Sequence, residues 1–215
     1  MKGKFITFEG PEGAGKTTQI KQVYQYLLNR GFRCLVVREP GGTEIGNRIR
    51  QILLDPDLSE MEWKTEVLLY AASRAQIVHE VIKPHLDKGF IVLCDRYIDS
   101  SLAYQGYGAE KSVSEVWRIN DWATDGLMPD RTYLLDVPVE LGQKRLLNRS
   151  ARKDRMELKE KMFHERVRSG FQKMAHREKD RYCLIRGDQS SNRVFADIVD
   201  DLMNWMSSLK QDVPK

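Results

Sequence analysis

The sequence predicts a doubly wound α/β domain, with helices flanking a five-stranded parallel sheet. Short runs rich in Val, Ile, Leu and Phe are apolar throughout rather than alternating, as strands covered on both faces require. Helical patterns fill the intervals between these runs, and such alternation is typical of a parallel sheet. No internal repeat or Pro/Ser-rich linker divides the 215 residues, so we expect one domain over 1–215. The expected strands are residues 4–9, 33–38, 90–95, 131–136 and 181–186.

Punctuating residues mark the helices between the first three strands. A helix over 16–29 opens after a glycine-rich turn and closes at Gly31. The Ser-x-x-Glu pattern at 59–62 is a capping box, which predicts the start of a long helix. We expect this helix to run to about residue 87, with Pro84 bending its last turn.

The second half of the chain shows similar signals. A second Ser-x-x-Glu pattern at 112–115 opens a helix that is expected to end before Asp125-Gly126. Further helices are expected over 138–148 and 156–178, the latter punctuated by Gly170. A closing helix has one apolar stripe at three- and four-residue spacing, formed by Val194, Ile198, Leu202, Trp205 and Leu209.

The composition is that of an ordinary globular protein, with 35 Lys and Arg against 31 Asp and Glu, a net charge of +4. No apolar run approaches the ~18 residues of a membrane span, and no secretory leader pattern is present. The three cysteines lack Cys-x-x-Cys spacing, which argues against a disulfide framework or a zinc site. We therefore expect buried reduced thiols, a cytoplasmic location and no membrane partner.

Basic side chains gather between Lys144 and Arg155, a window with a charge of +5. Two interpretations stay open at this point: a solvated helix face, or an anion-binding segment aimed at phosphates. The rest of the chain is slightly acidic, at −1, so no general nucleic-acid surface is expected.

The segment Gly10–Thr17 fits the pattern G-x-x-x-x-G-K-[ST] and lies between a predicted strand and a predicted helix. Its glycines at 10, 13 and 15 let backbone N–H groups turn inward around phosphate oxygens. The helix N-terminus adds partial positive charge. Lys16 reaches the terminal phosphates and the Thr17 hydroxyl can bind Mg²⁺. A nucleoside triphosphate, held in a fold like that of the P-loop NTP hydrolases, is therefore expected.

The third predicted strand ends in Asp95-Arg96-Tyr97. GTPases show Asp-x-x-Gly and Asn-Lys-x-Asp patterns, and helicases or transport ATPases a strand ending in Asp-Glu; none of these is present. Asp95 can hold Mg²⁺ through water, while Arg96 grips the phosphate of a second, anionic substrate. A strand-end ion pair is the alternative interpretation.

In these residues and in several further blocks, the chain resembles the thymidylate kinase (dTMP kinase) family. The resemblance lies in blocks that follow the family order and cover the chain from about residue 4 to about residue 205. It implies the reaction ATP + dTMP → ADP + dTDP with Mg²⁺, which supplies dTTP synthesis, and it implies a homodimer. The blocks are Phe8–Thr18, Arg38–Thr43, Tyr70–Gln76, Asp95–Tyr97, Ser101–Gly106 and Phe163–Arg168.

The resemblance also implies roles for single residues. Arg38 and Arg96 would clamp the dTMP phosphate, Tyr70 would stack on thymine, and Arg74 would bind a ring carbonyl. Tyr104 would fill the space of a ribose 2′-hydroxyl. From their spacing alone, the alternative interpretation is that Tyr70 and Tyr104 are aromatic residues packed in the core. The implied ATP-binding residues are Gly10, Pro11, Glu12, Gly13, Ala14, Gly15, Lys16, Thr17 and Thr18. The implied dTMP-binding residues are Glu12 (for the 3′-hydroxyl), Arg38, Tyr70, Arg74, Arg96, Ser101, Tyr104 and Gln105, and the implied Mg²⁺ ligands are Thr17 and Asp95, partly through water.

In the family, the basic window corresponds to a helical lid insertion, here at about 145–158, that closes over ATP. The loop residues Pro11-Glu12 bring no cation, so the arginine that stabilises the transferring phosphoryl group is expected from the lid. Arg152 is the first choice, with Arg149 and Arg155 as alternatives, because the stretch around Asp154 is shorter than in lid-arginine relatives. Catalysis would be positioning plus charge neutralisation by Lys16, Arg96, the lid arginine and the Mg²⁺ at Asp95.

Two other functions stay open at this stage. A kinase of another nucleoside monophosphate, or of a deoxynucleoside, would share the fold and differ in the base pocket. A module that binds nucleotide and switches partners without turnover would need neither a basic lid nor an arginine clamp.

Overall fold

The computed structural model describes residues 3–147 and 154–211. One sheet of five parallel strands has the order β2-β3-β1-β4-β5, which confirms the predicted doubly wound fold. Each strand matches its predicted run or begins one residue later. The strands are β1 (Lys4–Glu9), β2 (Cys34–Arg38), β3 (Ile91–Asp95), β4 (Arg131–Asp136) and β5 (Tyr182–Arg186).

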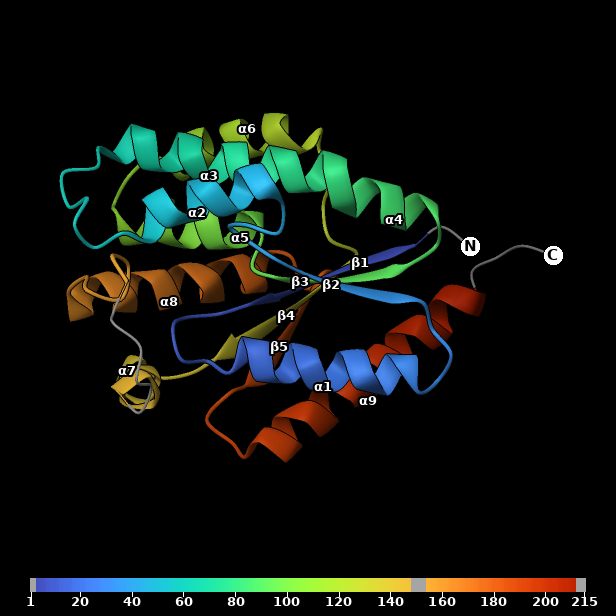
Figure 1. The fold of residues 1–215 in the computed structure, drawn as a ribbon. Coiled ribbons are helices and arrows are strands. Elements are labelled where there is room, and N and C mark those ends of the chain that lie inside the picture. The colour runs from blue at the N-terminus through green and yellow to red at the C-terminus, as the bar shows by residue number, and fades with distance from the viewer. Residues whose placement is uncertain (1–2, 148–153, 212–215) are drawn as a thin grey trace.

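Helices cover both faces of this sheet (Figure 1). On one face lie α1 (Lys16–Leu28) and α9 (Ser191–Gln211); on the other lie α2 (Glu44–Leu54), α3 (Trp63–Ile77) and α6 (Val113–Thr124). Neighbouring residues of β1 point to opposite faces, so Phe5 joins the α3 and α6 core while Ile6 joins the α1 and α9 core. Continuous apolar strands are thus explained by two separate cores.

The parallel register brings the carboxyl ends of the strands to one edge. Phe8 of β1 lies opposite Asp95 of β3 and Tyr133 of β4. The loop after β1 therefore emerges beside the end of β3, at the point where the strand order reverses. Ligands of doubly wound folds bind at this crevice.

The prediction of a capping box at Ser59 is wrong. The helix α3 begins at Trp63, and the Glu62 carboxylate caps it by accepting from the Lys64 N–H. Downstream, α3 passes through a wide turn, η1 (Val78–Ile82), into α4 (Lys83–Asp87). Because Pro84 has no N–H to donate and its ring clashes with the preceding turn, the helix widens ahead of it.

The segment after β3 is helical and buried: α5 (Ile98–Ser101) continues into η2 (Leu102–Gly108). The predicted start of α6 is confirmed, because the Ser112 hydroxyl accepts from the Glu115 N–H, and Asp125 ends the helix with φ +50°.

Two helices flank the undescribed residues 148–153: α7 (Val139–Leu147) and α8 (Lys161–Arg177). The prediction that α8 starts at 156 is wrong. The Asp154 carboxylate accepts from the backbone N–H groups of Met156 and Glu157, a turn that competes with a helix. Within the described residues, no helix is long and apolar enough to cross a membrane.

Candidate active site

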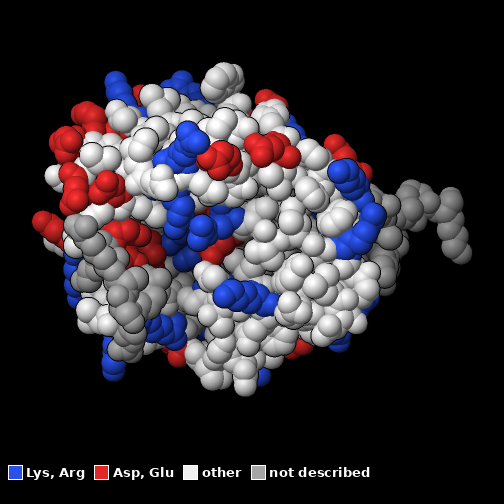
Figure 2. All heavy atoms as spheres, in the orientation of Figure 1, with Lys and Arg blue, Asp and Glu red and all other residues white. Residues whose placement is uncertain are grey.

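A cavity of about 570 Å³ opens at the carboxyl edge of the sheet. Figure 2 shows a hollow on this face with Lys and Arg side chains gathered in it. Most of the predicted site residues line the cavity, although they come from separate segments. They are Glu12, Gly13, Ala14, Gly15, Lys16, Thr17, Thr18, Arg38, Tyr70, Arg74, Asp95, Arg96, Ser101, Tyr104 and Gln105. Gly10, Pro11 and Arg155 do not line it, and Arg149 and Arg152 lie outside the described residues.

The loop between β1 and α1 has the geometry of a phosphate cradle. Gly13 has φ +70° and packs so closely on α7 that a Cβ would lie 2.3 Å from the Gly142 carbonyl oxygen. Lys16 Nζ folds back to donate to the carbonyl oxygens of Gly10 and Pro11, at 2.9 and 3.0 Å. Burial, and then the nearby Arg96 cation, lower the pKa of Lys16 to about 8, so it remains mainly protonated at pH 7.

Oxygen ligands meet beside this cradle. The Thr17 hydroxyl, in the first turn of α1, donates to Asp95 Oδ2 at 2.8 Å. Among the described residues there is no group of three or more His, Cys, Asp or Glu side chains that would enclose a metal. One hydroxyl and one carboxylate next to a phosphate site fit Mg²⁺, which takes its remaining ligands from phosphates and water.

Arg96 follows β3 in the left-handed region, with φ +72°. Its guanidinium donates to the Gly10 carbonyl at 3.0 Å, to the Ser100 hydroxyl at 3.1 Å and to Glu12 Oε1 at 2.8 Å. Tyr104 donates its hydroxyl to the same Glu12 oxygen at 3.0 Å. Burial alone would raise the pKa of Glu12, but the Arg96 and Lys16 cations lower it to about 2. The cavity floor thus holds a fixed carboxylate between two cations.

Two more arginines line the cavity. Arg38, at the end of β2, is exposed, whereas Arg50 of α2 is half-buried and donates to the Pro40 carbonyl at 2.9 Å. Burial, and then repulsion from Arg38, lower the pKa of Arg50. Arg50 was not predicted as a site residue because α2 was not predicted from the sequence. The available signal was Thr43, whose hydroxyl caps α2 by accepting from the Gly46 N–H at 3.0 Å.

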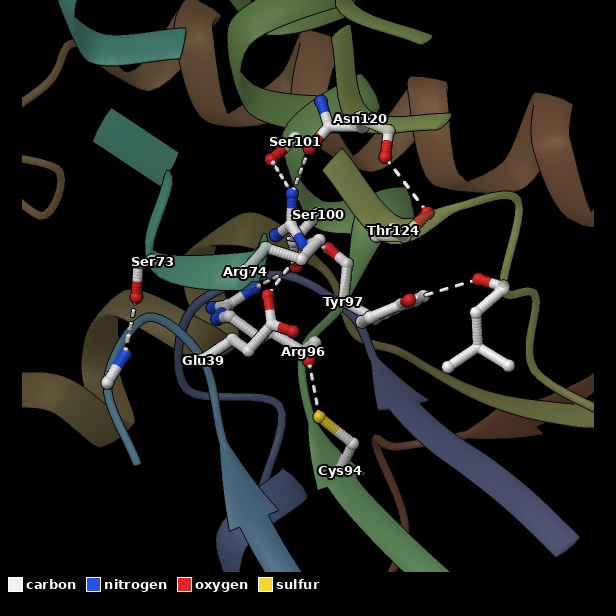
Figure 3. A network of polar contacts seen from close by, with 12 residues as sticks. Glu39, Ser73, Arg74, Cys94, Arg96, Tyr97, Ser100, Ser101, Asn120 and Thr124 are labelled. Atoms are coloured by element: carbon white, nitrogen blue, oxygen red, sulfur yellow. Dashed lines mark hydrogen bonds and ion pairs between the residues drawn. The ribbon is translucent and has the colours of Figure 1, made fainter. Parts of the chain in front are cut away.

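Arg74 lines the cavity but is almost fully buried, and Figure 3 shows it within a network of polar contacts. It donates to Glu39 Oε2 at 2.6 Å, to the Ser101 hydroxyl at 2.9 Å, to the Asn120 side-chain oxygen and to the Tyr97 carbonyl at 3.0 Å. Burial raises the pKa of Glu39 to about 7, against the pull of Arg74. These bonds use four of the five N–H donors of a guanidinium, so one remains for a ligand.

Arg155 lies in the wall behind the cavity. Its Nε donates to the Leu53 carbonyl at 3.1 Å, and its Nη2 forms an ion pair with Glu66 at 2.6 Å. Neither partner belongs to the phosphate cradle. In this structure Arg155 therefore joins the segment after residue 153 to α2 and α3 and does not line the cavity.

Comparisons with known proteins agree with this geometry. A family model described as "Thymidylate kinase" matches residues 8–198. The chain is 47% identical over 206 residues to "Thymidylate kinase" of Exiguobacterium sibiricum, covering 96% of this chain and 97% of that protein. It is 51% identical over 191 residues to that of Geotalea daltonii, covering 86% and 89%. The crystal structure of thymidylate kinase from Ehrlichia chaffeensis matches with a TM-score of 0.76 and 32% identity, covering 94% and 99%.

Proposed function

The chain belongs to the thymidylate kinase family, and we infer from this membership that it transfers the γ-phosphoryl group of ATP to dTMP, giving ADP and dTDP. It is thus a nucleoside monophosphate kinase. The observation that supports the reaction most directly is one cavity lined both by a phosphate cradle and by a set of arginines.

On the donor side, the backbone N–H groups of Gly13–Thr18 bind the ATP phosphates at the N-terminus of α1. Lys16 moves from the carbonyl oxygens of its own loop to the terminal phosphates, because an anion is the stronger partner. Thr17 and Asp95 would hold Mg²⁺, which supplies charge neutralisation on the triphosphate.

On the acceptor side, Arg96, Arg38 and Arg50 hold the dTMP phosphate. An oxygen of this phosphate attacks the γ-phosphorus, and the bond from the γ-phosphorus to the β–γ bridging oxygen breaks to release ADP. The attacking oxygen is already anionic, so no general base is required. Repulsion between Arg38 and Arg50 supports the proposal, since a bound phosphate relieves it.

The nucleoside lies deeper in the cavity. Tyr70 stacks on the thymine ring, while Arg74, Ser101 and Gln105 bind its polar edge. Glu12 accepts from the 3′-hydroxyl, and Tyr104 excludes a 2′-hydroxyl. The bond from Tyr104 to Glu12 supports this arrangement, because it fixes the ring beside the carboxylate that would bind the sugar.

The arginine that stabilises the transferring group is proposed to be Arg152 or Arg149, in the lid at about 145–158. Arg155 is held by Glu66, which leaves the other two for this role. Arg152→Ala should lower kcat more than it raises KM, since the contact acts mainly in the transition state.

We propose a single domain over 1–215 that works in the cytoplasm as a homodimer, with ATP and dTMP as its small-molecule partners and with neither nucleic acid nor membrane. The dimer would bury exposed apolar side chains on α2, α3 and α6, which lie side by side on one face (Figure 1). These side chains are Ile45, Ile52, Leu68 and Trp122.

A coupled assay of ADP release, with MgATP and a panel of dTMP, dUMP, UMP, CMP, AMP and GMP, tests the reaction. We expect rapid turnover of dTMP and little of UMP. Turnover of a purine or ribose monophosphate in preference to dTMP would contradict the base and sugar assignments. No turnover of any monophosphate would contradict the kinase assignment.

A further inference from the structure

Gln105, on η2, lines the cavity and is held both at its side-chain amide and at its backbone. Its Nε2 donates to Glu66 Oε1 at 2.7 Å, and its backbone carbonyl accepts from the Trp63 indole N–H at 2.8 Å. Only 2% of Gln105 is exposed. The amide therefore has a single orientation, set by Glu66.

A carboxylate can only accept hydrogen bonds, so the amide must turn its NH₂ group to Glu66 and its oxygen away from it. Within the described residues, Gln105 Oε1 accepts no hydrogen bond, and it is not among the fully buried atoms that lack a partner. Because Gln105 lines the cavity, this oxygen is the side-chain acceptor that it offers to a ligand there.

Glu66 is itself fixed by a buried cation. Its Oε2 lies 2.6 Å from Arg155 Nη2 in an ion pair that lacks the angles of a hydrogen bond, and the two residues are 8% and 6% exposed. Removing the acceptor would leave the guanidinium buried without its counter-charge, which is strongly unfavourable. Arg155 therefore holds Glu66, and Glu66 holds the Gln105 amide.

Arg74 presents the opposite polarity to the same cavity, because it has only donors and one of them is unused. An acceptor at Gln105 and a donor at Arg74 match a ring N–H beside a carbonyl, the edge of thymine. They oppose a ring nitrogen acceptor beside an amino group, the edge of cytosine.

We infer that Glu66 is a positioning residue for base selection: by fixing the Gln105 oxygen toward the cavity, it makes the site favour pyrimidines with a ring N–H and reject those of cytosine type. This inference rests on the proposed function, because it places the base of the monophosphate beside Gln105. Glu66 itself need not touch the substrate.

The test compares dTMP with 5-methyl-dCMP, which has the same sugar, phosphate and 5-methyl group and differs only at the edge in question. In Glu66→Gln, the new carbonyl oxygen stays with Arg155, so its NH₂ group faces Gln105. The Gln105 amide then turns over and presents NH₂ to the cavity. We expect the ratio of kcat/KM for dTMP to that for 5-methyl-dCMP to fall about tenfold or more, chiefly through KM. Turnover of 5-methyl-dCMP should rise in absolute terms, which a merely damaged fold would not produce.

Glu80→Gln is the matched control, because Glu80 accepts from the Gln76 amide at 2.7 Å on the exposed surface. Its selectivity ratio should equal that of the wild type. If Glu66→Gln fails to fold, Gln105→Met provides the second test: it keeps the length of the side chain, removes the amide and should lower the ratio by weakening dTMP alone.

Calorimetric measurement of the binding of both monophosphates tests the role of Glu66 in base selection separately from the kinase reaction. Wild-type protein that binds dTMP in preference to 5-methyl-dCMP without turning it over would overturn the kinase function and leave the base selection supported. A binding ratio in the folded Glu66 or Gln105 variant equal to that of the wild type would overturn the role of Glu66.

Discussion

Arg96 combines an unfavourable backbone conformation with a side chain that lies at the centre of the proposed active site. Its φ of +72° is disfavoured for a non-glycine residue by about 1–2 kcal/mol. The backbone is held there by the bond from its N–H to the Phe8 carbonyl at 3.1 Å. This turn lifts the guanidinium from the end of β3 to the Gly10 carbonyl and Glu12, between the phosphate cradle and the proposed acceptor site.

Arg96→Ala should therefore remove acceptor binding and leave the donor cradle in place. We expect kcat/KM for dTMP to fall by about 10³-fold or more, because the variant loses a charge-assisted phosphate contact made in the transition state. Calorimetric affinity for MgATP should change by less than about threefold, since the N-terminus of α1 supplies most of the phosphate binding. Arg33→Ala, at an exposed arginine ahead of β2, is the control. Equal losses of dTMP turnover and ATP affinity would contradict the clamp role.

Glu9 is a buried carboxyl group that the sequence analysis did not single out. It accepts from the Tyr97 N–H at 2.7 Å and from the Ser100 hydroxyl at 2.6 Å. Burial first, and then the nearby Asp99 carboxylate, raise its pKa to about 8. The folded state therefore binds a proton at this site more tightly than the unfolded chain does, for which 4.5 is the ordinary value.

This difference predicts how stability depends on pH. A group with a raised pKa in the folded state stabilises fully below its unfolded pKa, and that contribution is lost as pH rises from about 4.5 to about 8. Glu9→Gln, which is neutral throughout, should flatten the fall by up to about 1.4 kcal/mol per pH unit. Urea unfolding at pH 5, 6.5 and 8 measures this, with Glu115→Gln as an exposed control. Parallel pH profiles for wild type and Glu9→Gln would show that Glu9 titrates normally.

The residues predicted from sequence are those whose signal is local. The phosphate cradle and Asp95-Arg96 are contiguous with a strand, so spacing alone was enough to place them. Glu39 and Asn120 are contacts of Arg74 that lie 35 and 46 positions away in the chain, and no local pattern connects them. Glu66 escaped notice for the same reason, because its partners Gln105 and Arg155 are joined to it only by tertiary packing.

At the scale of elements, strands were easier to predict than helix boundaries. A strand buried on both faces must be apolar throughout, and this signal survives any detail of packing. Helix starts depend on which side chain caps the first turn. Glu62, and not Ser59, caps α3. The turn made by Asp154 prevents α8 from starting at residue 156. The short helix α2 was missed although Ile45, Ile49, Ile52 and Leu53 recur at helical spacing, a signal that the sequence carries.

Gly170 illustrates how an element is misjudged from composition. Gly170 is expected to punctuate the helix over 156–178, yet α8 runs through it without interruption. A Cβ there would lie 2.6 Å from the ring of Tyr107 on η2, so the glycine allows two helical segments to pack closely. Gly170 therefore serves close packing of α8 against η2 and does not interrupt the helix.

Gly170→Ala therefore sets two effects against each other. Alanine favours a helix by about 1 kcal/mol, whereas forcing a methyl group against the half-buried Tyr107 ring costs about 1–3 kcal/mol. Because the clash involves ring carbons on a packed segment, we expect net destabilisation, seen as a lower urea midpoint with an unchanged slope. Ser169→Ala, one residue earlier, should leave the midpoint nearly unchanged. A higher midpoint for Gly170→Ala would show that η2 moves aside easily.

At the scale of the whole molecule, the strand order explains why one cavity is lined both by the phosphate cradle and by several arginines. The chain passes from β1 to β2 and β3 on one side and to β4 and β5 on the other, so loops diverge at the carboxyl edge. The cradle follows the central strand β1, while the arginines that line the cavity come from β2, α2, α3, the end of β3 and α7. The net charge of +4 is small, so composition does not explain the positive charge of the cavity. The Lys and Arg side chains that line it are brought together by the topology of the sheet.

The proposed homodimer is tested at the same scale. Leu68, on α3 between α2 and α6, is 57% exposed, and the symmetry of a two-fold interface makes any substitution there occur twice. Leu68→Glu should thus bring like charges into an apolar contact. We expect the mass measured by sedimentation equilibrium to fall from twice the 25.0 kDa chain mass to that of one chain. Leu184→Glu, at a 54% exposed leucine on the edge strand β5, is matched in chemistry and should leave the dimer intact. A wild-type monomer at micromolar concentration would contradict the dimer itself, and dissociation by Leu184→Glu instead of Leu68→Glu would move the interface to the β5 edge.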